Sequence, residues 1–98
     1  MSHKILCMQH SNSQKAKIYI ETLGKIIKEE RLKQNKSQCL LADEFDIQKS
    51  MLSRIESAVN EPKLISLLTI CEALDMKFSD LILKVEKEIP KDFTLIEK

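Results

Sequence analysis

The chain has 98 residues, the size of one small domain, and 43% of them are hydrophobic while 32% are charged. A single Gly, two Pro and few aromatic residues favour an all-α fold and exclude a glycine-rich phosphate-binding loop. No apolar run approaches the ~18 residues of a membrane span, and the apolar stretch Ile5–Met8 is too short for the core of a signal peptide. We therefore expect a cytoplasmic protein.

The formal net charge is only +1, but it is unevenly distributed along the chain. Residues 1–35 carry seven Lys or Arg and three Glu, a net charge of +4, whereas residues 36–63 carry −1 and residues 64–98 carry −2. The N-terminal third is therefore better suited than the middle to attract a nucleic acid.

The first 16 residues lack a hydrophobic period, and we predict that they form a flexible arm. From about Lys17, apolar residues recur at the spacing of an amphipathic helix: Ile20, Leu23, Ile26, Ile27 and Leu32. Asn35 is expected to end this helix in a left-handed conformation, which Asn tolerates well. Ser37 is expected to cap the helix that follows.

Two short helices are predicted next, over residues 38–45 and 48–57, with a tight turn at Asp46 and Ile47. Their apolar faces are expected to pack together and consist of Leu41, Ala42 and Phe45 on the first helix and Leu52 and Ile55 on the second. The opposite face of the second helix is polar. Such a helix can enter the major groove of DNA, which is about 12 Å wide. Because the same arrangement also occurs as a scaffold, periodicity alone leaves DNA binding and a structural role open.

The C-terminal third predicts two further helices. The first follows Pro62, ends near Asp75 and has an apolar face made of Leu64, Leu67, Leu68, Cys71 and Leu74. Ser79 is expected to cap the second, with Asp80 in its first turn and Leu81, Ile82 and Val85 on its apolar face. Pro90 ends any helix. The predicted organisation is an arm at 1–16, a helical domain at 17–85 and a tail at 86–98. The apolar residues Phe93, Leu95 and Ile96 of the tail are compatible either with folding back onto the core of the same chain or with pairing with a second subunit, and we favour the second, in which the tail is a dimerisation element.

From Leu23 to Ile82 the chain resembles the lambda-repressor-like (XRE, or Cro-repressor) helix-turn-helix family. The similarity is carried by the stretches LGKIIKEERLKQN, SQCLLADEFDI, SMLSRIES and EPKLISLLTICEALDMKFSDLI. The resemblance implies a five-helix, DNA-binding domain with the helix-turn-helix at residues 38–57. It also implies a sequence-specific transcription regulator, a repressor that binds a two-fold operator on double-stranded DNA as a homodimer.

Site residues follow from the same resemblance. The family pattern implies base contacts from the second helix of the motif, at Lys49, Ser50, Ser53 and Arg54, of which Arg54 or Lys49 suits guanine O6 and N7. It implies phosphate contacts from Ser37, Gln38 and Lys63. It also implies a partly buried ion pair between Arg31 and Glu56 that clamps the first helix to the recognition helix.

The sequence departs from the family pattern at its turns. The family often has Gly at the positions of Asn35, Asp46, Ala58 and Asp75. Asn and Asp replace Gly well where φ is positive, whereas Ala does not, so we expect a reshaped turn at Ala58. The loop after the recognition helix is often basic in the family, but Val59, Asn60 and Glu61 carry no positive charge. We therefore expect modest or strongly salt-dependent affinity for DNA.

A monomer reads only a few base pairs, so specificity requires two protomers. The candidate dimer interface consists of Phe78, Leu81, Ile82, Val85, Phe93 and Ile96. A second hypothesis is a protein-interaction module, such as an antitoxin bound to its toxin, that keeps the helix-turn-helix as scaffold.

Neither an enzyme, a cofactor nor a metal site is predicted. The sequence has no catalytic constellation, and His3, Cys7 and His10 have no fourth metal ligand in view. The three cysteines are odd in number and widely spaced, which argues against disulfides. Cys71 is expected in the core and Cys39 near the surface, and Met51 and Met76 are expected to be packing residues.

Overall fold

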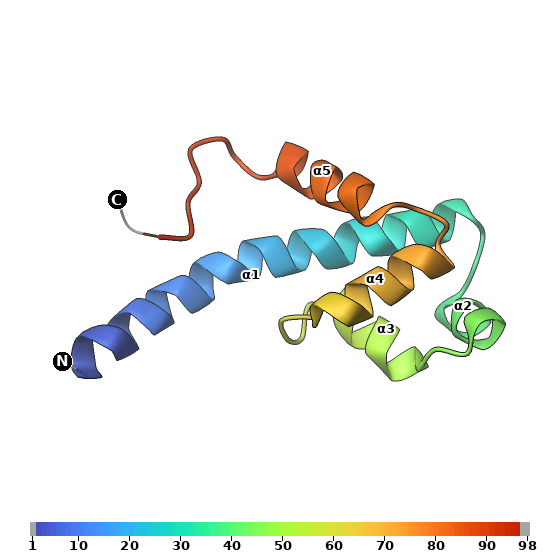
Figure 1. Cartoon of the computed structure of the whole chain (residues 1–98), viewed down its shortest axis with the longest axis horizontal. Helices are drawn as coiled ribbons and strands as arrows, with labels where there is room; N and C mark the ends of the chain where they lie inside the picture. The colour runs from blue at the N-terminus through green and yellow to red at the C-terminus, as the bar shows by residue number, and fades with distance from the viewer. Residues whose placement is uncertain (1, 97–98) are drawn as a thin grey trace.

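The computed structural model describes residues 2–96, with side chains from Gln14 onward. These residues form five α-helices, as predicted: α1 (Ser2–Lys33), α2 (Gln38–Phe45), α3 (Lys49–Glu56), α4 (Leu64–Ala73) and α5 (Phe78–Glu88). The long α1 crosses the whole molecule, and the other four helices gather around its C-terminal half (Figure 1). Helices α3 and α5 both pack directly on α1. Among the described residues, no helix combines the length and apolar character that a membrane crossing requires.

A single core joins all five helices. Its most deeply buried side chains come from different elements and include Ile27, Leu41, Leu52, Ile70 and Leu81. Met51 and Met76 pack against this core, and Cys71 lies within it, as predicted, whereas Cys39 is exposed. Phe45 was expected to face inward but is 48% exposed, and Lys36 lies over its ring at 5.4 Å from the ring centroid. The aromatic ring is covered by a cation at the surface rather than by the core.

The connections between helices use left-handed residues. Asn35, Asp46, Ala58 and Asp75 have φ between 54° and 57°. Asn35 ends α1 as predicted, and Asp46 is the C-terminal cap of α2, with its N–H donating to the carbonyl of Ala42. Ala58 does not reshape its turn, contrary to expectation. It adopts the same left-handed backbone conformation as the other three residues. In this conformation the Cβ atom of Ala58 is close to the backbone, which is unfavourable and would not occur with Gly.

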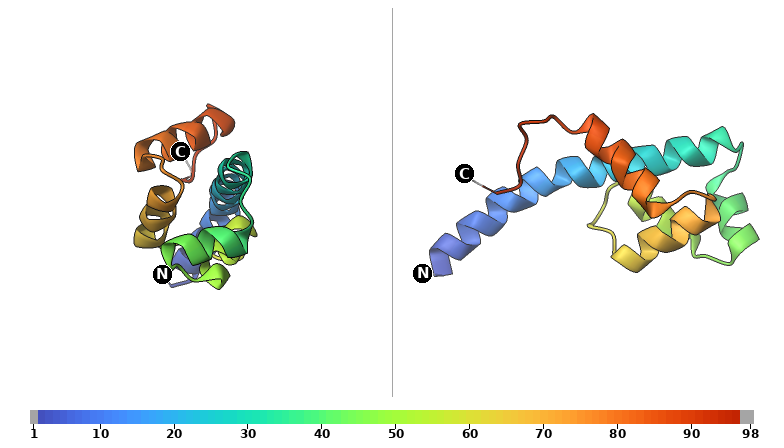
Figure 2. Two further views of the ribbon diagram at one scale, coloured as in Figure 1. Left: turned by 90° about the vertical axis from the view of Figure 1, so that its right-hand side faces the viewer. Right: turned by 45° about the horizontal axis from the view of Figure 1, so that its top comes forward.

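Helix α1 begins at Ser2, not near Lys17 as the hydrophobic period predicted. The first 23 residues contain neither Gly nor Pro, so no residue there interrupts a helix. An apolar stripe is absent because this part of α1 extends past the other helices and has no core to face (Figure 2). The side chains of His3, Cys7 and His10 lie outside the described residues.

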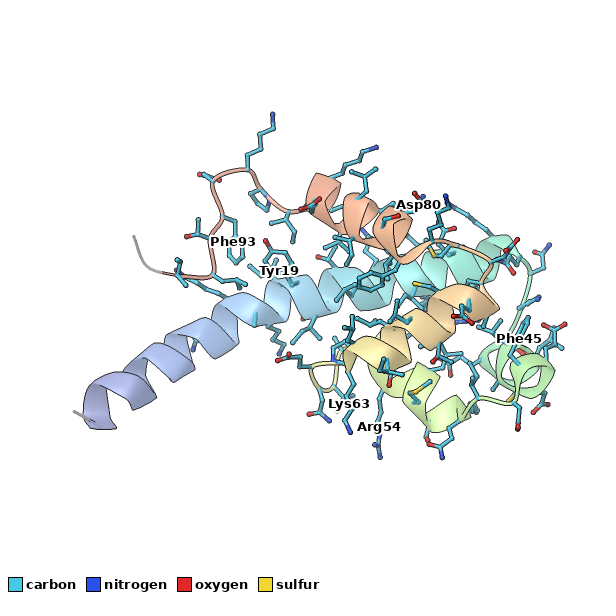
Figure 3. The ribbon with its side chains drawn as sticks, in the orientation of Figure 1. Tyr19, Phe45, Arg54, Lys63, Asp80 and Phe93 are labelled. Atoms are coloured by element: carbon cyan, nitrogen blue, oxygen red, sulfur yellow. The ribbon has the colours of Figure 1, made fainter. Side chains whose placement is uncertain are left out.

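The end of the chain differs from prediction in two respects. Ser79 does not cap α5, because the helix already begins at Phe78 and its N-cap residue is Lys77. Met76 and Phe78, on either side of Lys77, both pack against the core. Of the two alternatives for the tail, the structure has the one that was not favoured, because Phe93 folds back onto α1. Its ring lies 5.8 Å from that of Tyr19, measured between centroids, with the two ring planes tilted by 51°, and Figure 3 shows the two side chains near each other.

The predicted dimer surface on α5 is also affected. Leu81 and Val85 are fully buried in the core of the monomer, so they cannot form an interface between subunits. Phe78 and Ile82 are half-buried, and Ile96 is exposed. The apolar period of α5 identified the face correctly but not what covers it, which is the rest of the same chain.

Candidate nucleic-acid interface

Helices α2 and α3 form a compact pair joined by a tight turn. Ser37 is the N-cap residue of α2, and its hydroxyl oxygen accepts a hydrogen bond of 3.0 Å from the backbone N–H of Leu40. The turn between the helices is closed by the N–H of Ile47, which donates to the carbonyl of Ala42 at 3.0 Å. Ala42 is buried between the helices, where its small side chain permits their close approach. This pair is a helix-turn-helix, and α3 occupies the position of the recognition helix.

The polar face of α3 is exposed as its period predicted. Lys49, Ser50 and Arg54 are exposed, whereas Ser53 is half-buried, so three of the four predicted base-contacting residues are freely accessible. Leu52 and Ile55, on the other face, are buried in the core. Within residues 14–96, Lys49 and Arg54 form no ion pair, so both positive charges are directed to solvent.

Lys63 lies beside Arg54, although it belongs to a different element. It is the N-cap residue of α4 and makes no side-chain capping hydrogen bond. Figure 3 shows Arg54 and Lys63 projecting from the same side of the molecule, away from α5. The structure therefore brings together a predicted base-contacting residue and a predicted phosphate-contacting residue. Both side chains line one cleft of about 350 Å³ between α3 and the loop that leads to α4.

That cleft adds residues that the sequence interpretation missed. The residues that were not predicted are Gln48, the N-cap residue of α3, Asn60 in the loop and Ser66 in α4, and the predicted Ser50 and the acidic Glu61 also line the cleft. Gln48, Asn60 and Ser66 supply hydrogen-bonding groups beside the two cations. Their only signal in the sequence was proximity to the motif, because neither loop residues nor helix caps have a hydrophobic period.

A buried ion pair between Arg31 and Glu56 connects α1 to α3. The guanidinium Nε and Nη2 of Arg31 donate to the two carboxylate oxygens of Glu56, each at 2.8 Å, and the side chains are only 6% and 3% exposed. A third hydrogen bond of 2.6 Å runs from Nη1 of Arg31 to the carbonyl of Lys36. The hydrogen bonds from Arg31 to Glu56 raise the pKa of the guanidinium, which therefore stays charged despite its burial.

Gln38 also forms a hydrogen bond with Glu56. Its side-chain Nε2 donates to Oε1 of Glu56 at 3.0 Å, which links the first residue of α2 to the last residue of α3. Of the three predicted phosphate-contacting residues, Gln38 is thus partly engaged within the protein, whereas Ser37 and Lys63 are exposed. The Nε2 group has a second hydrogen, which remains for an external acceptor.

Negative charge lies close to this surface. Glu61 shares the cleft with Arg54 and Lys63. Helix α2 and its cap carry exposed Asp43, Glu44 and Asp46, and among the side chains that the structure describes only Glu44 of these has an ion-pair partner, Lys36 at 2.7 Å. The surface around α3 is therefore a local cationic feature in a nearly neutral region.

Known proteins show the same architecture. The helix-turn-helix family model matches residues 27–81, from the C-terminal part of α1 to the first turn of α5. The crystal structure of the clp gene regulator ClgR from C. glutamicum superposes with a TM-score of 0.66 over 76% of this chain and 96% of that chain. At 20% sequence identity, that likeness shows the fold. No curated protein matches the sequence. Because the family match covers more than half of the residues, the chain belongs to the helix-turn-helix family, of XRE type.

Proposed function

We propose that this protein is a sequence-specific DNA-binding transcription regulator that represses its target as a homodimer on a two-fold operator. The observation that carries the proposal is Arg54. Among the residues whose side chains the structure describes, it has no ion-pair partner and is an exposed cation on the polar face of α3, and the buried Arg31–Glu56 pair helps to hold that helix in place. A fixed recognition helix with an unpaired Arg is suited to read a base in the major groove.

Each predicted contact residue has its own role in binding DNA. Arg54 donates two hydrogen bonds to O6 and N7 of guanine, and Lys49, Ser50 and Ser53 contact neighbouring base edges. Lys63, Ser37 and the second N–H of Gln38 bind backbone phosphates and set the register of α3 in the groove. Repression follows if the occupied site overlaps a promoter. Such a protein acts in the cytoplasm, where the DNA is.

A protein-interaction role is the second candidate, and the acidic surface of α2 favours it. Asp43, Glu44 and Asp46 are exposed within one helix and its cap, and residues 36–63 have a net charge of −1. Phosphates repel these carboxylates, whereas a basic protein, for example a toxin, would be attracted to them. An antitoxin that also binds its own operator would combine both roles.

The experiment compares two single substitutions of exposed cations. Wild type, Arg54→Ala and Lys91→Ala are titrated against duplex DNA from upstream of the gene for this protein. Lys91 lies in the tail, is exposed and forms no ion pair within residues 14–96, so it controls for the loss of one positive charge. We expect Arg54→Ala to lose about 1–3 kcal/mol of specific binding, while Lys91→Ala binds as the wild type does. Equal binding by all three proteins would refute the role of α3.

A further inference from the structure

We infer that a second copy of this chain docks on an apolar patch that α1 and the tail form together, through a two-fold contact in which the two α1 helices run antiparallel. The patch consists of Ile18, Leu95 and Ile96 and is called the α1–tail patch below. The inference rests on the proposed function, which requires two protomers, and deepens it by naming the surface that joins them in the absence of DNA.

The tail brings the patch together. The contact of 5.8 Å between the rings of Phe93 and Tyr19 holds the tail against α1. Figures 1 and 2 show the end of the tail beside the part of α1 that precedes this contact. Phe93 packs against the core, but Leu95 is 40% exposed, Ile96 62% and Ile18 40%. The apolar surface therefore continues beyond the residues that the monomer covers, which is typical of an interaction site.

The first half of α1 has little support from the rest of the monomer. Tyr19 is the first of its described side chains that packs against the core, so residues 2–18 form a helical extension about 25 Å long. Most of the stability of a helix in a protein comes from tertiary packing, and this extension contains the weak helix formers Ser11, Asn12 and Ser13. We therefore expect the side of the extension that the tail leaves open to pack against another chain.

The charges beside Ile18 identify that chain as a second copy. Lys17 and Glu21 are exposed and lie one helical turn apart, and neither has an ion-pair partner among the side chains that the structure describes. In a two-fold contact between antiparallel α1 helices, Lys17 of each copy can reach Glu21 of the other, so the surface is complementary to itself. A uniformly basic or acidic partner, or the phosphates of DNA, would attract one of these two charges and repel the other.

The position of the patch along α1 fits a two-fold operator. The end of α3 meets α1 between Gly24 and Arg31. The midpoint of this junction lies about ten residues beyond Ile18, or about 15 Å along the helix. A two-fold axis at Ile18 therefore places the two junctions about 30 Å apart along α1. Half-sites one helical turn apart are separated by about 34–36 Å, which is similar when α1 runs along the duplex.

The contact is small, so the dimer that it forms in free solution is weak. A stable interface buries about 800 Å² on each partner. Three partly exposed apolar side chains and the neighbouring turns of α1 provide less than that. Association is therefore concentration-dependent, and its dissociation constant is the quantity that the variants should change.

The first test measures this constant without DNA, by sedimentation velocity of the full chain at concentrations up to about 1 mM. Wild type, Ile18→Gln and Leu83→Gln are compared, and Leu83, 51% exposed on α5, provides the matched control. We expect the wild type and Leu83→Gln to pass from monomer to dimer with the same dissociation constant. Ile18→Gln should dimerise at least about tenfold more weakly, while its circular dichroism shows that it is folded.

Charge reversal tests the two-fold geometry without changing the apolar patch. Lys17→Glu places carboxylates opposite each other in the contact, and Glu21→Lys places ammonium groups opposite each other, so each single variant should dimerise at least about tenfold more weakly. The double variant Lys17→Glu, Glu21→Lys restores an attractive arrangement and should dimerise as the wild type does. Failure of the double variant to recover dimerisation would overturn the antiparallel pairing.

The inference and the function on which it rests fail in different experiments. A wild type that stays monomeric at every concentration, or an equal dissociation constant for Ile18→Gln, would overturn the α1–tail patch as the interface and leave specific DNA binding intact. If the wild type dimerises as expected but binds the native and scrambled duplexes equally, the contact stands and the proposed regulator function is wrong.

Discussion

Arg31 and Glu56 meet face to face across two helices, through two hydrogen bonds of 2.8 Å, with almost no exposure to water. The pair joins the C-terminal part of α1 to the last residue of α3. Because Glu56 also accepts from Gln38, one carboxylate connects α1, α2 and α3. This buried acid and its two donors therefore help to hold the recognition helix in place, together with Leu52 and Ile55 in the core.

Replacing Arg31 with Met should destabilise the protein far more than a surface substitution does. Glu56 would keep its negative charge in the interior without a partner, which typically costs about 3–5 kcal/mol. The free energy of unfolding from urea titration measures the loss. The double variant Arg31→Met, Glu56→Leu removes both charges and should recover most of it. A loss below about 1 kcal/mol in the single variant would show that the pair contributes little to the fold.

Gly24 of α1 lies close to the backbone at the end of α3, and Gly24→Ala should be destabilising. A Cβ atom at residue 24 would collide with the backbone carbonyl oxygen of Ile55 and come within 3.0 Å of that of Glu56. Since backbone atoms cannot rotate away, the helices must separate, at a cost of about 1–3 kcal/mol. In an isolated helix the same change would be stabilising by about 1 kcal/mol. A rise in the thermal unfolding midpoint would contradict the close approach.

Replacing Ala58 with Gly should stabilise the protein. Its φ of 56° is unfavourable for any residue with a Cβ, by about 1–2 kcal/mol, and Gly removes that cost. Part of the gain is offset by the greater freedom of Gly in the unfolded chain. We expect Ala58→Gly to increase the free energy of unfolding by about 1 kcal/mol, whereas Ala16→Gly, within α1, should lower it by a similar amount. Equal losses at both positions would mean that the turn is not left-handed.

The lowered pKa of Glu30 predicts that the protein loses stability in acid. The hydrogen bond from Lys33, together with the charge of Lys84, holds the pKa of Glu30 below its ordinary value of 4.5. A carboxyl whose pKa is lower in the folded state stabilises the fold above its unfolded pKa, and this contribution disappears as the pH falls through the folded pKa. Glu30→Gln should therefore be less stable than the wild type at pH 7, and the difference should shrink below pH 4.5. Glu29→Gln, at an exposed neighbour, should show a smaller difference in unfolding midpoint at pH 7.

The central helices were predictable because several local signals agreed. In α2, the cap at Ser37, the apolar pair Leu41 and Ala42 and the left-handed Asp46 all indicated the same boundaries, and the structure has them. The polar face of α3 followed from the same spacing, since a helix with a buried stripe must expose the other side.

The parts that were mispredicted depend on tertiary packing. The hydrophobic period alone cannot predict that α1 begins at Ser2, because helical turns that face no core have no apolar stripe. Nor can it decide whether an apolar face, such as that of Leu81 and Val85, meets its own chain or a partner. The hydrogen bond between Gln38 and Glu56 joins residues 18 positions apart and has no local signature.

The most direct test of the central claim is equilibrium binding of the purified protein to DNA from upstream of its own gene. The titration uses the native duplex and a scrambled duplex of equal composition across a series of salt concentrations. We expect the native duplex to bind roughly a thousandfold or more tightly than the scrambled duplex at physiological salt, with two protomers per site. Weak, equal binding to both duplexes that vanishes at moderate salt would contradict it, because only non-specific attraction to phosphates would remain.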